Sequence, residues 1–106
     1  MRSPWTGFSV RKLNAEEQKR FPMGRFVGGV ALEYVWKNSP AEQLGLRAGD
    51  ILVRFGHYRT PDVAAFQKWL YMHGVGYQVT LHVLRGDAVI ERPYKIEERP
   101  QWAAPR

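Results

Sequence analysis

Alternating apolar and polar positions predict β-strands in several parts of the chain. Residues 30–37 (VALEYVWK) place Val30, Leu32, Tyr34 and Trp36 on one face, and residues 77–84 (YQVTLHVL) alternate in the same way. Shorter apolar runs predict further strands at residues 8–13, after a loop that contains Gly7, and at residues 51–55 and 89–97. The pattern therefore predicts five short strands.

The two last strands are predicted to form a hairpin. Gly86 and Asp87 separate them, and this pair is typical of a two-residue turn. Pro93 lacks a backbone N–H, so the final strand is expected at an edge of the sheet.

Apolar residues spaced three and four apart predict the longest helix, at residues 60–74 (TPDVAAFQKWLYMHG). Thr60 is the expected N-cap, Pro61 the first helical position, and Gly74 the residue that ends the helix. The apolar stripe of this helix consists of Val63, Phe66 and Leu70.

Two shorter helices are predicted from their capping residues. Asn14, followed three residues later by Glu17, forms a capping box at the start of a helix over residues 14–21. Ser39 before Pro40 begins a second helix, which Gly45 ends in left-handed backbone geometry. The turn that follows is expected to be stabilised by the side chain of Asp50.

These elements predict an α+β fold: a partly open antiparallel β-barrel or sandwich of five to six short strands, capped by two to three helices. The chain has 106 residues, of which 44% are hydrophobic, enough for one domain with a modest core. We expect the domain to span residues 1–97 and a C-terminal tail or linker to span residues 98–106.

Charge and composition exclude several function classes. The net charge is +6, but no five like charges are consecutive, and no glycine–aromatic run of RNA-binding sheets is present, so no nucleic acid is expected as a partner. Cysteine is absent, which excludes disulfides and thiol catalysis. No apolar run approaches the 18 or so residues of a membrane span, so direct membrane insertion is not expected.

Catalytic and metal-binding residue patterns are not apparent. Ser3, Ser9 and Ser39 lie outside any nucleophile motif. The three histidines, at positions 57, 73 and 82, do not have the spacing of metal ligands. We therefore expect a domain that is not an enzyme and that needs no metal and no cofactor.

Two segments, residues 38–55 (NSPAEQLGLRAGDILVRF) and residues 60–87 (TPDVAAFQKWLYMHGVGYQVTLHVLRGD), resemble PDZ domains. With WTGFSV at residues 5–10, their order resembles the circularly permuted PDZ domains of bacterial HtrA (Deg-type) serine proteases, in which the peptide-binding loop and strand come first. The resemblance extends over residues 5–95, nearly the whole chain.

The resemblance implies a site for peptides or protein C-termini. Glycine-containing loop residues would receive the terminal carboxylate through backbone N–H groups, and the following strand would pair with the peptide. The residues that match are Trp5, Thr6, Gly7 and Phe8 in the loop, Phe8, Ser9, Val10 and Arg11 in the strand, and Val63, Gln67 and Leu70 on the helix. The last ligand side chain would enter a pocket between Phe8, Val10, Val63 and Leu70, which favours an apolar C-terminal residue.

Three further features of this chain bear on the expected site. Thr6 stands where an aliphatic residue is common, which would narrow or polarise the pocket floor. Arg11 and Lys12 suggest tolerance for acidic residues upstream in the ligand. Residues 14–29 form a long insertion after the binding strand, which resembles the HtrA pattern and is a candidate cover for the site.

Two functions follow from the resemblance. In the first, the domain recognises substrates or regulates a larger HtrA-type serine protease of the bacterial periplasm or cell envelope, with a protease domain elsewhere in the parent chain. In the alternative, it is a regulatory or assembly PDZ domain of an intramembrane metalloprotease or a secretion component, with its groove occupied by a neighbouring domain.

Overall fold

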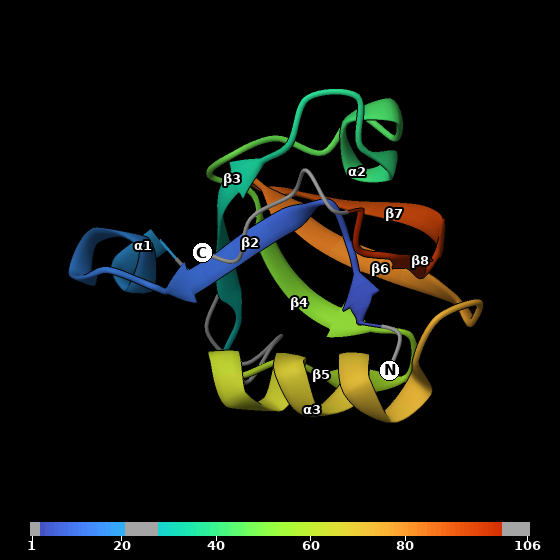
Figure 1. The fold of residues 1–106 in the computed structure, drawn as a ribbon. Coiled ribbons are helices and arrows are strands. Elements are labelled where there is room, and N and C mark those ends of the chain that lie inside the picture. Colours follow the sequence, from blue (N-terminus) through green and yellow to red (C-terminus); the bar gives the residue numbers. More distant parts are fainter. Residues whose placement is uncertain (1–2, 21–27, 101–106) are drawn as a thin grey trace.

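The structure is a computed structural model that describes residues 3–20 and 28–100. Eight strands and three helices occur in these residues (Figure 1). In chain order they are β1 (Pro4–Trp5), β2 (Phe8–Lys12), α1 (Ala15–Arg20), β3 (Val30–Val35), α2 (Pro40–Gln43), β4 (Ile51–Phe55), β5 (Tyr58–Arg59), α3 (Val63–His73), β6 (Gln78–Arg85), β7 (Ala88–Lys95) and β8 (Glu97–Glu98).

The main sheet is antiparallel and has the strand order β2-β3-β4-β6-β7, with β5 paired to β4. Strands β1 and β8 form a separate antiparallel pair that joins the two ends of the described chain. The predicted α+β fold with a partly open antiparallel sheet is confirmed, as is the position of the last long strand, β7, at a sheet edge. Strand β8 lies across the expected domain boundary at residue 97, and that boundary stays a prediction.

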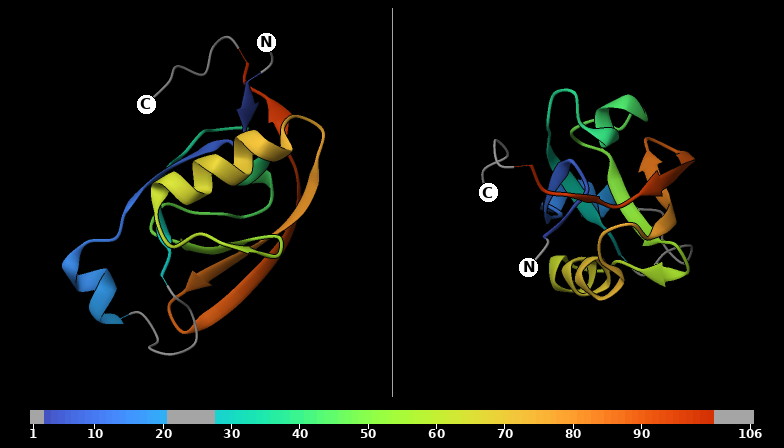
Figure 2. Two further views of the ribbon diagram at one scale, coloured as in Figure 1. Left: turned by 90° about the horizontal axis from the view of Figure 1, so that it is seen from below. Right: turned by 45° about the vertical axis from the view of Figure 1, so that its right-hand side comes forward.

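The main core lies between the sheet and α3, which crosses one side of the molecule (Figures 1 and 2). Phe66 and Leu70 of α3 are buried in it against Phe8 of β2 and Phe55 of β4, as their helical spacing predicts. A smaller cluster forms on the other face of the sheet, and its buried members are Leu13, Ala31, Ile51, Val53 and Leu84.

The predicted N-cap of α3 was wrong. Asp62, not Thr60, caps the helix: its Oδ1 accepts a hydrogen bond from Ala65 N at 2.8 Å. Thr60 is fully buried, and its hydroxyl donates to Leu52 O at 2.9 Å. Both residue types favour N-caps, and here the buried carbonyl of β4 takes the threonine hydroxyl as its partner.

One face of β3 also differs from the prediction. Val30 and Leu32 are buried, but Tyr34 is 40% exposed. The pairing of β2 with β3 shifts between Ser9 and Val10, which is a β-bulge or irregularity of the ladder. Such a shift breaks the strict alternation of faces, so Tyr34 leaves the core face on which strict alternation would place it.

No helix within the described residues is long and apolar enough to cross a membrane.

Candidate functional site

The loop between β1 and β2 turns on Gly7. This residue has φ +83°, a backbone conformation that residues other than glycine rarely adopt. Gly7 O accepts a hydrogen bond from Trp36 N at 2.9 Å, and the Thr6 hydroxyl donates to Phe8 O at 3.1 Å. The threonine that departs from the usual aliphatic residue is therefore buried with its hydroxyl satisfied inside the loop.

The N-terminal end of α2 closes the back of this loop. Ser39 is fully buried and caps α2 by accepting a hydrogen bond from Glu42 N at 3.2 Å. A Cβ added to Gly7 would lie only 2.6 Å from Ser39 Cβ. The loop therefore has room for glycine alone at this position.

A buried tyrosine supports the start of the loop. The Tyr94 hydroxyl of β7 donates to Trp5 O at 3.2 Å, and burial, followed by the nearby charge of Glu97, raises the pKa of Tyr94. Trp5 itself is buried, with its ring 6.0 Å from that of Trp36. Sequence reasoning missed Tyr94, although the alternation of the last strand gave a signal by placing a tyrosine two residues before the buried Ile96.

Strand β2 and helix α3 bring together the other predicted site residues. Strand β2 ends the main sheet, and no described strand pairs with its outer edge. Helix α3 packs against β1 and β2, and the rings of Phe8 and Phe66 lie 5.8 Å apart. Along this side, Phe8 and Leu70 are buried, Val10 and Val63 are partly buried, and Gln67 is exposed. We call this region, which comprises the 5–8 loop, β2 and the Val63–Gln67–Leu70 face of α3, the β2–α3 site.

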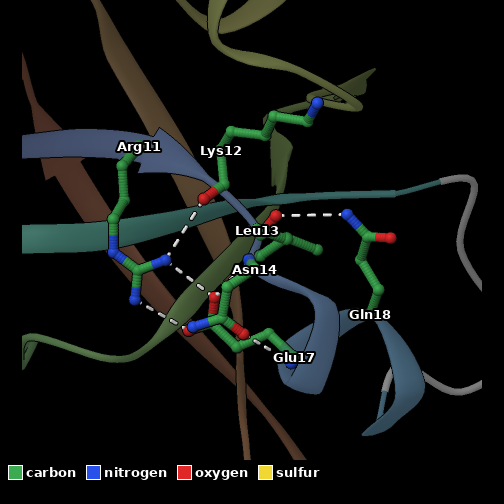
Figure 3. Close-up of polar contacts among 6 residues, drawn as sticks. All are labelled: Arg11, Lys12, Leu13, Asn14, Glu17 and Gln18. Carbon is green, nitrogen blue, oxygen red and sulfur yellow. Dashed lines mark hydrogen bonds and ion pairs between the residues drawn. The ribbon is translucent and has the colours of Figure 1, made fainter.

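The Arg11 side chain is engaged away from this site. Its Nη1 and Nη2 atoms donate to the two carboxylate oxygens of Glu17 at 2.7 and 2.9 Å (Figure 3). Glu17 is buried, and it also accepts from Asn14 N at 2.9 Å while Asn14 Oδ1 accepts from Glu17 N, so the predicted capping box is confirmed. The hydrogen bond to Glu17 raises the pKa of Arg11. The cation expected beside the ligand thus links β2 to α1.

Two further predictions concern Ser9, expected in the pairing strand, and residues 14–29, expected to cover the site. Ser9 Oγ is buried and has no hydrogen-bond partner within the described residues. The insertion at residues 14–29 contributes α1, but residues 21–27 lie outside the described part, so its role as a cover stays a prediction.

Comparisons with known proteins agree with this architecture. A model of the PDZ domain family matches residues 4–93. The Do-like serine protease HtrA of Lactobacillus helveticus is 29% identical over 69 residues, which are 65% of this chain and 17% of that protein. A probable periplasmic serine endoprotease, DegP-like, of Chlamydia pneumoniae is 22% identical over 95 residues, which are 90% of this chain and 19% of that protein. The chain spans less than a fifth of the length of these relatives.

Solved structures share the fold. A variant of the HtrA-type protease AlgW with a decapeptide superposes with a TM-score of 0.80 at 23% identity, and the match covers 98% of this chain and 31% of that one. The HtrA3 PDZ domain bound to a phage-derived ligand (FGRWV) gives a TM-score of 0.68 at 19% identity, covering 93% of this chain and 88% of that one. The family match covers most of the chain, and the loop, edge strand and helix have the order that the resemblance implied. The chain belongs to the PDZ domain family.

Proposed function

We propose that the domain captures the C-terminal segment of a polypeptide at the β2–α3 site. The peptide adds to the outer edge of β2 as a further strand, and its terminal carboxylate is received by backbone N–H groups of Thr6, Gly7 and Phe8. The observation that carries this proposal is the outer edge of β2 beside α3, which no described strand covers and which starts directly after a loop turned by a positive-φ glycine.

The side chains around the site favour an apolar last residue in the ligand. Phe8 and Leu70 contribute buried apolar surface, and Val10 and Val63 are only partly covered, so an entering aliphatic side chain would bury more of both. Gln67 is exposed one turn after Val63, where it offers a hydrogen bond to an upstream side chain. Trp5 lies at the start of the loop, and Ser9 and Arg11 lie in β2, where their backbone belongs to the edge that pairs with the peptide.

The affinity is expected to be modest. A peptide of four or so residues must be ordered on binding, which leaves about 8 kcal/mol, or a micromolar dissociation constant. The solved structures of AlgW with a decapeptide and of the HtrA3 domain with FGRWV support the choice of ligand class.

The relatives also support the parent protein that we propose. They are HtrA and DegP-like serine proteases, and several are named periplasmic, so we place this domain in a larger envelope protease as its substrate-recognition or regulatory part, with a protease domain as partner. None of the relatives named above is an intramembrane metalloprotease or a secretion component, so the assembly alternative gains no support.

A titration with matched peptides tests the proposal. The peptide FGRWV with a free C-terminus is expected to shift the backbone amide resonances of residues 6–10, and its amidated form is expected to bind at least about tenfold more weakly, because it lacks the terminal charge. Equal binding of the two forms would overturn carboxylate capture.

A pair of variants on α3 locates the bound peptide. Gln67→Glu and Lys68→Gln each lower the net charge by one, but Gln67 lies on the Val63 face whereas Lys68 lies over the Trp69 ring at 5.1 Å. We expect Gln67→Glu to strengthen binding of free FGRWV about two- to threefold, because the new carboxylate would face the arginine of the peptide, and Lys68→Gln to leave it within about twofold. A larger change in FGRWV affinity for Lys68→Gln than for Gln67→Glu would place the peptide elsewhere on the domain.

A further inference from the structure

The strand that leads into the 5–8 loop is held by the C-terminal end of the described chain. Strand β1 pairs with β8 in antiparallel register, which places Trp5 opposite Glu97. Just beyond this pairing, Arg99 N donates a hydrogen bond to Ser3 O at 2.9 Å. The two strands lie side by side in the left view of Figure 2, one in dark blue and the other in red. We call β1, β8 and the Ser3–Arg99 hydrogen bond the terminal pair.

Trp5 belongs both to the terminal pair and to the 5–8 loop. It is the last residue of β1, and Thr6 and Gly7 follow it directly. Each peptide unit is planar, so a movement of Trp5 passes through few free dihedral angles to the N–H group of Thr6. The position of β1 therefore sets where the backbone N–H groups of the loop lie.

The terminal pair is short and faces water on one side. Each of its strands has two residues, and both residues of β8 are exposed, whereas those of β1 are buried. Pairing of this length opens at a low free energy. Opening is limited at Ile96, which is buried, since its N donates to Tyr77 O at 2.9 Å and its O accepts from Gly76 N at 2.8 Å. Strand β8 thus has two available states, paired with β1 or released from it.

Other contacts hold Trp5 when β8 is released. The Tyr94 hydroxyl of β7 donates to Trp5 O at 3.2 Å, and the ring of Trp36 lies 6.0 Å from the Trp5 ring. Trp36 N also donates to Gly7 O at 2.9 Å. Release of β8 therefore loosens the start of the loop without detaching it from the domain.

We propose that the terminal pair is a positioning element for the 5–8 loop, so that closure of the pair and capture of a peptide carboxylate strengthen each other. This inference rests on the proposed function, because it assigns a control to the same site. A loop that is already held in one geometry loses less conformational freedom on binding, so the paired state binds the carboxylate more tightly than the released state. By thermodynamic linkage, a bound peptide stabilises the pair by the same factor.

The terminal pair would also connect the site to a neighbouring domain. In the larger protease proposed above, the sequence that follows β8 would continue directly from this pair. A neighbour that pulls β8 away from β1 would weaken carboxylate capture without contacting the β2–α3 site, and a bound peptide would resist that movement.

Hydrogen exchange of the Arg99 amide tests the effect of the peptide on the pair. This N–H is bonded to Ser3 O, so its exchange requires the pair to open. We expect saturating free FGRWV to slow the exchange about fivefold, and saturating amidated FGRWV to leave it within about twofold. An Arg99 exchange rate that is the same with and without free FGRWV would refute the coupling.

A pair of variants at position 99 tests the effect of the pair on the peptide. Arg99→Pro removes the N–H that bonds to Ser3 O, and Arg99→Ala, which keeps this N–H, is the matched control. Relative to Arg99→Ala, we expect Arg99→Pro to bind free FGRWV about fivefold more weakly and amidated FGRWV within about twofold. A loss of stability alone would not change the ratio of these two affinities in protein that stays folded.

A second variant tests the same loop without a proline. Tyr94→Phe removes the hydrogen bond to Trp5 O and is expected to lower the ratio of free to amidated FGRWV affinity about threefold, whereas Tyr71→Phe, at a 58% exposed position, leaves this ratio unchanged. An unchanged ratio in both Arg99→Pro and Tyr94→Phe would overturn the positioning role and leave carboxylate capture standing. Equal binding of free and amidated FGRWV by the original protein would instead overturn both proposals.

Discussion

Ser39 lies directly against Gly7. The segment at residues 38–55 that resembles PDZ domains therefore also forms the back of the 5–8 loop, the candidate site for a peptide carboxylate. A Cβ placed on Gly7 would be 2.6 Å from Ser39 Cβ and 2.8 Å from Ser39 Oγ. The two residues are far apart in sequence, and each has a local role of its own: a positive-φ turn at Gly7 and the cap of α2 at Ser39. Their contact makes the loop geometry depend on the position of α2.

The first prediction compares two glycines with the same backbone angle. Gly7 and Gly45 have φ +83° and +82°, but a Cβ on Gly45 would meet nothing within 4 Å. Gly45→Ala is expected to cost about 1 kcal/mol of unfolding free energy for the left-handed conformation, and Gly7→Ala about 3 kcal/mol, because it adds a steric clash. Chemical denaturation measures both values.

A double variant separates the clash from the backbone strain. Replacing Ser39 by Gly removes the clashing atoms and costs little as an N-cap. We therefore expect Gly7→Ala to be less destabilising in the Ser39→Gly background, by about 1 kcal/mol or more. Strict additivity of the two changes would contradict the contact.

The second prediction concerns the ion pair that holds the loop before β4. Asp50 is buried, and it accepts from Arg85 Nε and Nη2 at 2.9 and 2.8 Å and from Arg47 N at 2.9 Å. Arg85 Nη2 also donates to Gly45 O at 2.8 Å. Asp50→Asn is expected to lower the unfolding free energy by about 2–3 kcal/mol, because Arg85 keeps its charge and loses its counter-charge.

None of these hydrogen bonds involves a residue of the β2–α3 site, so the expected effect is on stability rather than on peptide contacts. Folded Asp50→Asn protein should bind FGRWV within about twofold of the original affinity, as isothermal titration would show. A large loss of affinity with unchanged stability would indicate that the turn has a direct role in binding.

The sequence predicted those features that depend on near neighbours. The Asn14–Glu17 capping box, the Ser39 cap of α2 and the Gly86–Asp87 turn each involve residues within three or four positions, and all three are present. The resemblance of WTGFSV and the α3 segment to PDZ domains supplied the β2–α3 site, which no local pattern would have revealed.

The features that the sequence did not predict depend on contacts between distant segments. Tyr94 and Trp5 are 89 residues apart, and Arg85 reaches Asp50 from 35 residues away. The cap of α3 was assigned to Thr60 because nothing local shows that a carbonyl of β4 would take its hydroxyl. The same holds for Arg11, whose position in β2 was predicted but whose partner, Glu17, was not.

The third prediction tests whether Arg11 acts on α1 rather than on the ligand. Its side chain is 35% exposed and that of Glu17 is 6% exposed, so we expect the pair to contribute about 1 kcal/mol to stability. A double-mutant cycle with Arg11→Gln and Glu17→Gln measures this coupling energy. Peptides with acidic or neutral upstream residues should bind Arg11→Gln in the same ratio as they bind the original protein. If Arg11→Gln shifts this ratio toward the neutral peptide, the Arg11 side chain favours acidic upstream residues of the ligand, as the sequence predicted.

The last prediction concerns alkaline stability and Tyr94. Burial raises the pKa of this phenol, so above about pH 10 the unfolded chain releases the Tyr94 proton while the folded chain retains it. The contribution of Tyr94 to stability is therefore complete below about pH 10 and falls by up to about 1.4 kcal/mol for each further pH unit.

At about pH 7, Tyr94→Phe should cost about 1 kcal/mol of unfolding free energy through the lost hydrogen bond to Trp5 O. The stability difference should shrink as the pH rises and reverse at about pH 11, whereas Tyr71→Phe, at a 58% exposed position, should run parallel to the original protein. Parallel curves for Tyr94→Phe and the original protein would show that this phenol titrates alike in the folded and unfolded states, and would contradict its burial beside Trp5.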